Sequence, residues 1–375
     1  MSKEIYIDPV NGVHSLLTAD DENHTRMRRI LAFAFSEKAL REQEPILRDY
    51  VDLLVQKLRE ESQGGKLVDI VNWYNYTTFD IIGDLCFGES FHNLDNKGEH
   101  PWISGVLKAV KIGMLHAQIR VIPPLGYIVK RAMPIFLKGA RSRIFGFTQE
   151  RVNKRLKQEM ERPDFMTYVL KSDGTEKGLS RPEIDTNFLM LTNAGSETTA
   201  TTLSACTYYL LRNPHVLRCL KEEIRGSFES EKDITVAAVN KLPYLIAVLT
   251  ETLRIHAPAP IAFPRFVNPG GATINGRWVP GGVSCSINLP TMNIMSLIKL
   301  PRLSLVFPTV LPINPNSTFQ SRSNFYRSAG SKNATQNSTG TEGAFYSLSL
   351  PDLVLVLARS SSNPQAPSLH LRLDR

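Results

Sequence analysis

The chain has 375 residues, of which 42% are hydrophobic and 21% are charged. This length and composition exclude a mainly disordered chain and allow one large domain or two domains of ordinary size. The net charge of +8 can attract nucleic acid, an anionic membrane surface or an acidic protein. Because the basic residues are scattered and interleaved with acids, we expect no nucleic-acid partner.

The cysteines favour free thiols in a reducing compartment. The sequence has Cys86, Cys206, Cys219 and Cys285, with no CxxC pair and no spacing typical of a disulfide framework or a zinc site. Buried, unpaired thiols are therefore expected. The sequence begins without an apolar signal segment, and no run approaches the ~20 apolar residues of a membrane span. We expect neither a signal peptide nor a transmembrane anchor in this chain.

Helical patterns dominate from about residue 20 to about residue 225. Apolar residues recur at three- and four-residue steps in these segments: 26–60, 68–87 (ending at Gly88), 187–211 and 235–254. A further segment, 108–137, must be broken by Pro123, Pro124 and Pro134, because proline lacks the backbone N–H that a helix interior needs. The long apolar helix predicted over 187–211 is closed by Asn213 and Pro214.

The character of the sequence changes after Pro258. Prolines at 258, 260 and 264 favour extended backbone. The segment 272–284 predicts a β-hairpin with Asn275-Gly276 at its turn. Beyond about residue 289 the periodic patterns give way to proline-, serine- and asparagine-rich sequence. We therefore assign 1–288 to the folded domain and 289–375 to a low-complexity tail that is disordered or aberrant.

The most informative segment lies inside the predicted helix 187–211 and runs Ala194-Gly195-Ser-Glu197-Thr198. Burying polar groups in an apolar helix costs free energy unless they form hydrogen bonds or serve a function. The two small residues weaken the helix locally, so a distorted turn can place Glu197 and Thr198 beside a groove that holds water or a diatomic molecule. The alternative is a buried, threonine-rich helix whose hydroxyls bond to the preceding turn.

A charged pair occupies the helix that follows Pro243. Glu251 and Arg254 lie at positions i and i+3, so they share one face of that helix. One interpretation is a surface ion pair of little energetic weight. The apolar residues around the pair favour instead a mostly buried structural clamp.

Two further segments carry arginines that can bind an anion. Arg265 follows the proline-rich stretch after Pro258, and His24-x-x-x-Arg28 opens the first predicted helix. One arginine from each segment can donate charge-assisted hydrogen bonds to an anionic ligand. For Arg26 and Arg29 a solvated basic helix face is the favoured interpretation.

Taken in order, these segments closely resemble motifs of the cytochrome P450 family. Residues 194–198 resemble its AGx(E/D)T oxygen-activation motif, Glu251-x-x-Arg254 resembles its ExxR clamp, and residues 24–28 fall where the family has WxxxR. The stretches 68–88 and 164–168 resemble fungal members that oxidise secondary metabolites. The resemblance covers roughly 20–288. It implies a mainly α-helical cytochrome P450 fold with small β-sheets, incomplete at both ends.

The resemblance also implies a role for each site residue. Thr198 and Glu197 would be catalytic and steer protons to bound dioxygen, while Glu251 and Arg254 would fix the scaffold on the haem side. Arg28 and Arg265 would contact the haem propionates. The full cofactor-binding set is His24, Arg28, Ala194, Gly195 and Arg265, with His24 replacing the tryptophan of the motif.

The family pattern fails after Asn288. The resemblance predicts a PERF-like segment followed by an FxxGxRxCxG loop, and residues 289–375 contain neither. The haem iron of this family needs an axial thiolate, and Cys285 has no glycine-rich loop around it, so no metal ligand is assigned. One hypothesis is that the tail comes from read-through or a frame shift.

The implied activity is a haem- and NADPH-dependent monooxygenase that uses O2 to hydroxylate a small apolar metabolite. Its electrons would come from NADPH-cytochrome P450 reductase. An intact form is expected at the cytosolic face of the endoplasmic reticulum membrane, and the chain as given in the cytoplasm. The alternative function is a catalytically inactive remnant without the axial cysteine.

Overall fold

The structure is a computed structural model that describes residues 11–119, 125–158, 162–171, 178–259, 265–274, 276–285 and 371–372. The chain divides into two compact units, one formed by residues 4–252 and 347–375 and the other by residues 1–3 and 253–346. The first unit is helical, and the described strands of the second form two small sheets.

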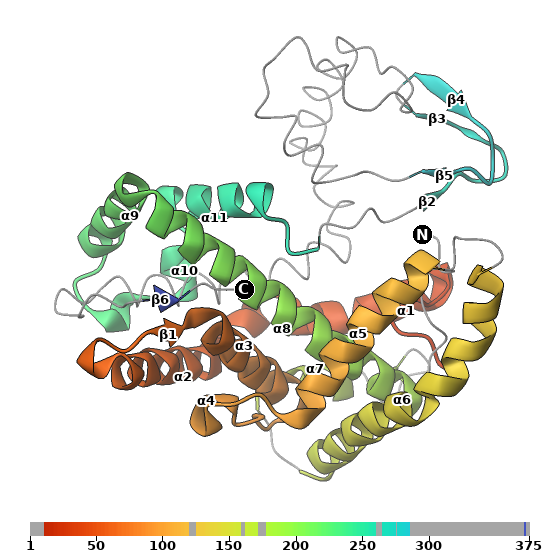
Figure 1. Ribbon diagram of the computed structural model, residues 1–375, viewed down its shortest axis with the longest axis horizontal. Coiled ribbons are helices and arrows are strands. Elements are labelled where there is room, and N and C mark those ends of the chain that lie inside the picture. Colours follow the sequence, from red (N-terminus) through yellow and green to blue (C-terminus); the bar gives the residue numbers. More distant parts are fainter. Residues whose placement is uncertain are drawn as a thin grey trace. The chain divides into compact units, whose positions relative to one another are not determined.

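The helical unit is built from α-helices that follow one another with short connections (Figure 1). They are α1 (Asp21–Ala32), α2 (Glu37–Glu61), α3 (Ile70–Phe87), α4 (Asn93–Asn96), α5 (Pro101–Ile119), α6 (Leu125–Lys157), α7 (Phe165–Leu170), α8 (Arg181–Arg212), α9 (Pro214–Ser227), α10 (Val236–Val239) and α11 (Pro243–Ile255). The short 3-10 turns η2 (Phe33–Phe35), η3 (Gln63–Gly65) and η4 (Glu231–Asp233) lie between them.

Local capping signals set the ends of these helices. The Asp69 carboxylate accepts hydrogen bonds from the backbone N–H groups of Val71 and Asn72 and so begins α3. Gly88 ends α3 with a φ of 71°, a left-handed conformation that glycine adopts without a side-chain penalty. Helix α8 begins with a capping box between Ser180 and Glu183. The predicted end of the 68–87 segment at Gly88 is confirmed.

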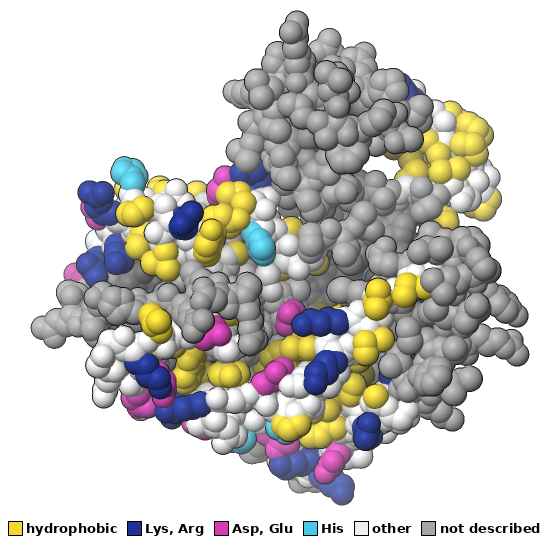
Figure 2. All heavy atoms as spheres, viewed as in Figure 1, with side chains coloured by type: hydrophobic (Ala, Val, Ile, Leu, Met, Phe, Trp, Pro, Cys, Tyr) yellow, Lys and Arg dark blue, Asp and Glu magenta, His cyan; other side chains and the backbone are white. Residues whose placement is uncertain are grey.

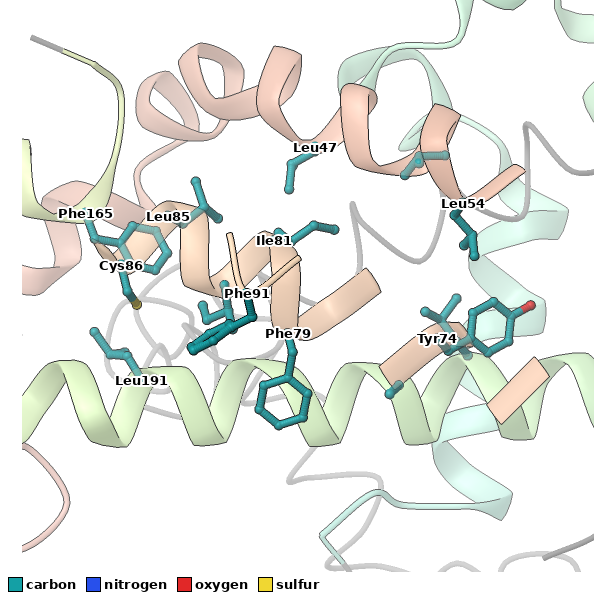
Figure 3. Packing of buried hydrophobic residues seen from close by; sticks show 14 of the residues in the cluster. Leu47, Leu54, Tyr74, Phe79, Ile81, Leu85, Cys86, Phe91, Phe165 and Leu191 are labelled. Atoms are coloured by element: carbon teal, nitrogen blue, oxygen red, sulfur yellow. The ribbon is translucent and has the colours of Figure 1, made fainter. Parts of the chain in front are cut away.

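The core of the helical unit is the packing of α3 between α2 and α8 (Figure 3). Phe79 of α3 is 1% exposed and points at α8, while Leu54 of α2 and Leu85 of α3 are fully buried. The Tyr74 hydroxyl of α3 lies 2.9 Å from the Thr207 hydroxyl of α8, which satisfies both buried groups. The burial of α3 on nearly all sides explains why its sequence is apolar without a clear polar stripe.

The predicted proline breaks fall at the boundary between α5 and α6 and inside α6. Helix α5 ends at Ile119 and α6 begins at Leu125, while Pro123 and Pro124 lie outside the described residues. Pro134 lies inside α6, so the predicted break at that position is wrong. A proline inside a helix removes one hydrogen bond, and a helix of this length keeps the others.

The β-structure is limited to pairs of short strands in the described ranges. Strands β3 (Ala272–Ile274) and β4 (Arg277–Val279) form the predicted antiparallel hairpin, with Gly276 at a φ of 76°. Strand β2 (Arg265–Phe266) pairs antiparallel with β5 (Ser284–Cys285). A mainly α-helical fold with small β-sheets is therefore confirmed.

Only residues 371–372 of the predicted tail are described. They form β6 (Leu371–Arg372), which pairs in parallel with β1 (Val68–Asp69) of the helical unit. The rest of 289–375, including its predicted disorder and the domain boundary at 288, lies outside the described residues.

The described helical surface mixes charges of both signs. On the face shown in Figure 2, lysines and arginines alternate with aspartates and glutamates. None of the helices in the described ranges combines the length and the hydropathy that crossing a lipid bilayer requires.

Candidate active site

Helix α8 carries the predicted oxygen-activating segment at its middle. It is an uninterrupted α-helix from Arg181 to Arg212, so the distorted turn predicted around Gly195 is not observed. Ser196 and Thr199 are buried, Thr198 is half-buried and Glu197 is exposed. The acid and the hydroxyl of the motif therefore lie on the more open side of the helix, turned away from its buried neighbours.

The hydroxyls of this segment bond to their own helix. Thr198 Oγ1 donates to the Ala194 carbonyl at 2.8 Å, and Thr199 Oγ1 donates to the Gly195 carbonyl at 2.8 Å. Ser196 and Thr202 make the same bond one turn back, at 2.7 and 2.9 Å. These bonds match the alternative interpretation of a threonine-rich helix whose hydroxyls bond to the preceding turn. The helix stays regular because each hydroxyl finds an acceptor without breaking a backbone hydrogen bond.

Gly195 faces α3 and does not open a groove. A Cβ atom at this position would lie 2.9 Å from Ile82 Cδ1 and 3.3 Å from Ile82 Cγ1 of α3. The missing side chain therefore lets two helices approach each other closely. The groove predicted beside this segment is not observed where Gly195 faces α3, because the Ile82 side chain fills the space.

The Glu197 carboxyl has a perturbed acidity. Although the side chain is exposed, protein surrounds the carboxyl on enough sides for desolvation to raise its pKa above the usual range of glutamate. Lys111 on α5 acts in the opposite direction and lowers this pKa, while Glu99 raises it. Lys111 was missed in the sequence, because no local pattern connects α5 with α8.

This shift predicts a pH dependence of stability. Because the folded pKa of Glu197 lies above its unfolded value, its contribution to stability is fully present below the unfolded pKa and is lost as the pH rises through the folded pKa. Glu197→Gln, which does not titrate, should therefore gain stability relative to the parent chain as the pH rises above the unfolded pKa of glutamate. The gain should stay below about 1 kcal/mol because solvent screens the exposed carboxyl.

Urea unfolding of both proteins at pH values below and above that unfolded pKa measures the difference. The variant Lys111→Met is the matched control, because removing the cation raises the Glu197 pKa further and moves the transition to higher pH. A difference between parent and Glu197→Gln that is independent of pH would contradict the assignment.

The predicted clamp on α11 is less buried than expected. Glu251 is exposed and Arg254 is half-buried. The buried stripe of α11 consists of Leu245, Leu249 and Thr252. The expectation of a mostly buried pair is wrong for the described residues, because the helix turns its apolar stripe inward and Glu251 outward. Its role as a scaffold clamp stays a prediction.

The basic residues of α1 divide between the interior and the surface. Arg26 is half-buried, forms an ion pair with Glu183 of α8 and donates to the Gly178 carbonyl at 2.7 Å. The expectation of a solvated Arg26 is therefore wrong, because α8 supplies a carboxylate that the local sequence does not contain. Arg29 is exposed, as predicted. His24 and Arg28 are half-buried on the same helix.

Arg265 lies on strand β2, in the other unit of the chain. The prediction that Arg265 and Arg28 bind one anionic ligand requires one residue from each unit. The shared propionate site therefore stays a prediction.

Two of the cysteines in the described ranges, Cys86 and Cys206, do not fit an axial haem ligand. Burial raises the pKa of the Cys86 thiol, and burial raises that of Cys206 to about 11, so both stay neutral inside the helical core. Cys219 and Cys285 are half-buried, so the expected burial of all four thiols is only partly confirmed. No group of three or more His, Cys, Asp and Glu residues suited to a metal occurs among the residues described. No reaction step through iron follows from these residues.

Comparison with known proteins gives several similar sequences. The chain is 45% identical over 282 residues to the cytochrome P450 monooxygenase lcsI of Purpureocillium lilacinum, covering 75% of this chain and 55% of that protein. It is 42% identical over 292 residues to the averantin hydroxylase of Dothistroma septosporum, covering 76% and 55%. The chain therefore spans little more than half the length of these relatives.

A solved structure has the same fold. The crystal structure of a mutant cytochrome P450DA heme domain superimposes with a TM-score of 0.67 at 20% identity, covering 92% of this chain and 72% of that one. Residues 5–294 match the family model described as Cytochrome P450. Together with the motifs on α1, α8 and α11, this match shows that the chain belongs to the cytochrome P450 family.

Proposed function

We propose that the chain is a monooxygenase that hydroxylates a small apolar metabolite in fungal secondary metabolism. The observation that carries this proposal is the placement of Glu197 and Thr198 at the middle of α8, on its more open side. The relatives support the reaction class, since they include monooxygenases and an averantin hydroxylase. Oxygen would be the co-substrate, and NADPH would supply electrons through cytochrome P450 reductase at the cytosolic face of the endoplasmic reticulum.

The side chains of α8 suit proton transfer. Desolvation raises the Glu197 pKa, so its carboxyl holds a proton to higher pH than a free glutamate does. The Thr198 hydroxyl lies one residue further along and can both accept and donate a proton. Neighbouring positions of a helix do not face each other, so the two side chains would act through bound water. Glu197 would supply the proton, and Thr198 Oγ1 would pass it on to the bound molecule.

A second candidate is a catalytically inactive remnant. The observation in its favour is that no described cysteine lies in a glycine-rich loop that presents it to haem: Cys86 and Cys206 are buried thiols, Cys219 lies on α9 and Cys285 lies on a short strand. An axial thiolate is the ligand that would favour oxygen–oxygen bond cleavage on haem in this family.

One spectrum separates the two candidates. The full 375-residue chain is produced with haem, reduced and exposed to carbon monoxide, and the difference spectrum is recorded. A Soret band at the thiolate position supports the monooxygenase. The absence of bound haem, or a band typical of a neutral axial ligand, would contradict it and leave the remnant.

Serine variants identify the ligand if the thiolate band is present. Cys285→Ser tests the thiol on β5, and Cys86→Ser is the matched control because that thiol is buried in α3. Loss of the thiolate Soret band in Cys285→Ser, but not in Cys86→Ser, identifies the Cys285 sulfur as the axial ligand.

A further inference from the structure

A histidine and a cysteine face each other on the surface of α9. His215 and Cys219 are four residues apart, so they lie on one face of the helix. The His215 Nδ1 atom lies 3.8 Å from the Cys219 Sγ atom. Neither residue belongs to the motifs on α8 or α11, and the spacing of the cysteines in the sequence gave no sign of this pair.

The separation of the two atoms matches that of two ligands on one metal ion. Zinc binds nitrogen at about 2.0–2.1 Å and thiolate sulfur at about 2.3 Å in tetrahedral geometry, which places the two donors about 3.6 Å apart. The observed 3.8 Å needs only a small side-chain movement to reach this value. Imidazole and thiolate are also the donor types that Zn²⁺ and Co²⁺ prefer.

The surroundings of the pair hold it in place and leave it accessible. Burial and the neighbouring Cys219 side chain raise the pKa of the Tyr244 hydroxyl, so α11 lies beside the pair. Glu223 of α9 fixes the start of α11 by accepting from the backbone N–H groups of Tyr244 and Leu245, both at 2.8 Å. Cys219 is half-buried and His215 is exposed, so an ion can approach from solvent.

We propose that His215 and Cys219 form a two-residue chelate for one zinc-like dication, with water completing its coordination. An ion that bridges two residues one turn apart stabilises that turn of α9. The site lies beside the junction of α9 and α11, since Cys219 contacts Tyr244. The proposal does not depend on haem binding or on monooxygenase activity.

Cobalt provides a spectroscopic test on the full chain. The untagged 375-residue protein is titrated with Co²⁺, and thiolate-to-cobalt charge-transfer absorption is expected at one ion per chain, with Zn²⁺ displacing the cobalt. Cys219→Ser should abolish this absorption. His215→Gln should weaken binding by at least about 10- to 100-fold, because even partners outside the coordination sphere have effects of that size.

Matched variants distinguish an ion bound by both His215 and Cys219 from an ion bound by the Cys219 sulfur alone. His215→Cys keeps two donors at the same spacing and should retain binding, and Cys285→Ser should bind as the parent does, because it removes a different half-buried thiol. Cobalt absorption that persists in Cys219→Ser, or that is unchanged in His215→Gln, overturns the proposal. Absence of absorption in the parent chain also overturns it and leaves only a weak S–H···N hydrogen bond.

Alkylation gives an independent measurement that does not require the variants. Zn²⁺ should slow the reaction of Cys219 with iodoacetamide, measured by peptide mass spectrometry, and leave the rate at Cys285 unchanged. Equal rates at Cys219 with and without Zn²⁺ contradict the chelate.

Discussion

Replacing Asp164 by alanine is expected to lower the free energy of unfolding by about 3–5 kcal/mol. Asp164 is fully buried and Arg155 is 1% exposed. Arg155 Nε donates to Asp164 Oδ2 at 2.7 Å, and Arg155 Nη2 donates to Oδ1 at 3.3 Å. The variant leaves the guanidinium buried without its carboxylate and also removes the cap of α7, since Asp164 Oδ1 accepts from the Thr167 N–H.

Urea unfolding measures this loss against two controls. Glu37→Ala removes one member of an exposed pair, Arg41 and Glu37, and should change stability by less than about 1 kcal/mol. The double variant Arg155→Met/Asp164→Leu should recover much of the loss, because two apolar side chains leave no buried charge. A single Asp164→Ala variant as stable as Glu37→Ala would show that the pair is not buried in solution.

Replacing Phe79 by alanine is expected to cost about 3–5 kcal/mol as well. Phe79 is 1% exposed on α3 and points at α8, the helix that carries Glu197 and Thr198 (Figure 3). The substitution leaves a cavity between these two helices. Amide hydrogen exchange should therefore accelerate along α8 more than along α9, because α8 packs extensively on α3 whereas α9 packs on α8.

Two phenylalanine variants serve as controls for the cavity. Phe79→Leu keeps most of the volume and should cost less than about 1.5 kcal/mol. Phe33→Ala removes a ring that is 59% exposed and should change stability by no more than about 0.5 kcal/mol. Similar losses in Phe79→Ala and Phe33→Ala would be inconsistent with the packing of α3 on α8.

Local signals in the sequence predicted much of the fold. The end of α3 at Gly88, the hairpin around Gly276 and the start of α11 at Pro243 all depend on residues that act within a few positions. The long central helix was predicted from 187, but α8 begins at Arg181. The apolar pattern missed its first residues because a capping box, and not burial, begins the helix.

Contacts between distant segments could not be predicted in this way. Arg26 was expected in solvent, and its carboxylate partner Glu183 lies 157 residues further along the chain. The order of the motifs predicted the family, but the space beside Gly195 depends on Ile82 of another helix. The exposure of Glu251 likewise depends on which face α11 turns toward the core.

The hydrogen bond from Thr198 to the Ala194 carbonyl adds a free-energy cost to the proton transfer proposed on α8. Its hydroxyl proton is already engaged at 2.8 Å, so any guest molecule that receives this proton competes with a neighbour in the same helix. The exchange costs on the order of 0.5–1.5 kcal/mol unless the guest offers an equal acceptor. An apolar guest cannot displace that carbonyl, whereas an oxygen that gains negative charge can. In the proposed reaction, Thr198 would therefore release its proton only to an oxygen on which negative charge develops.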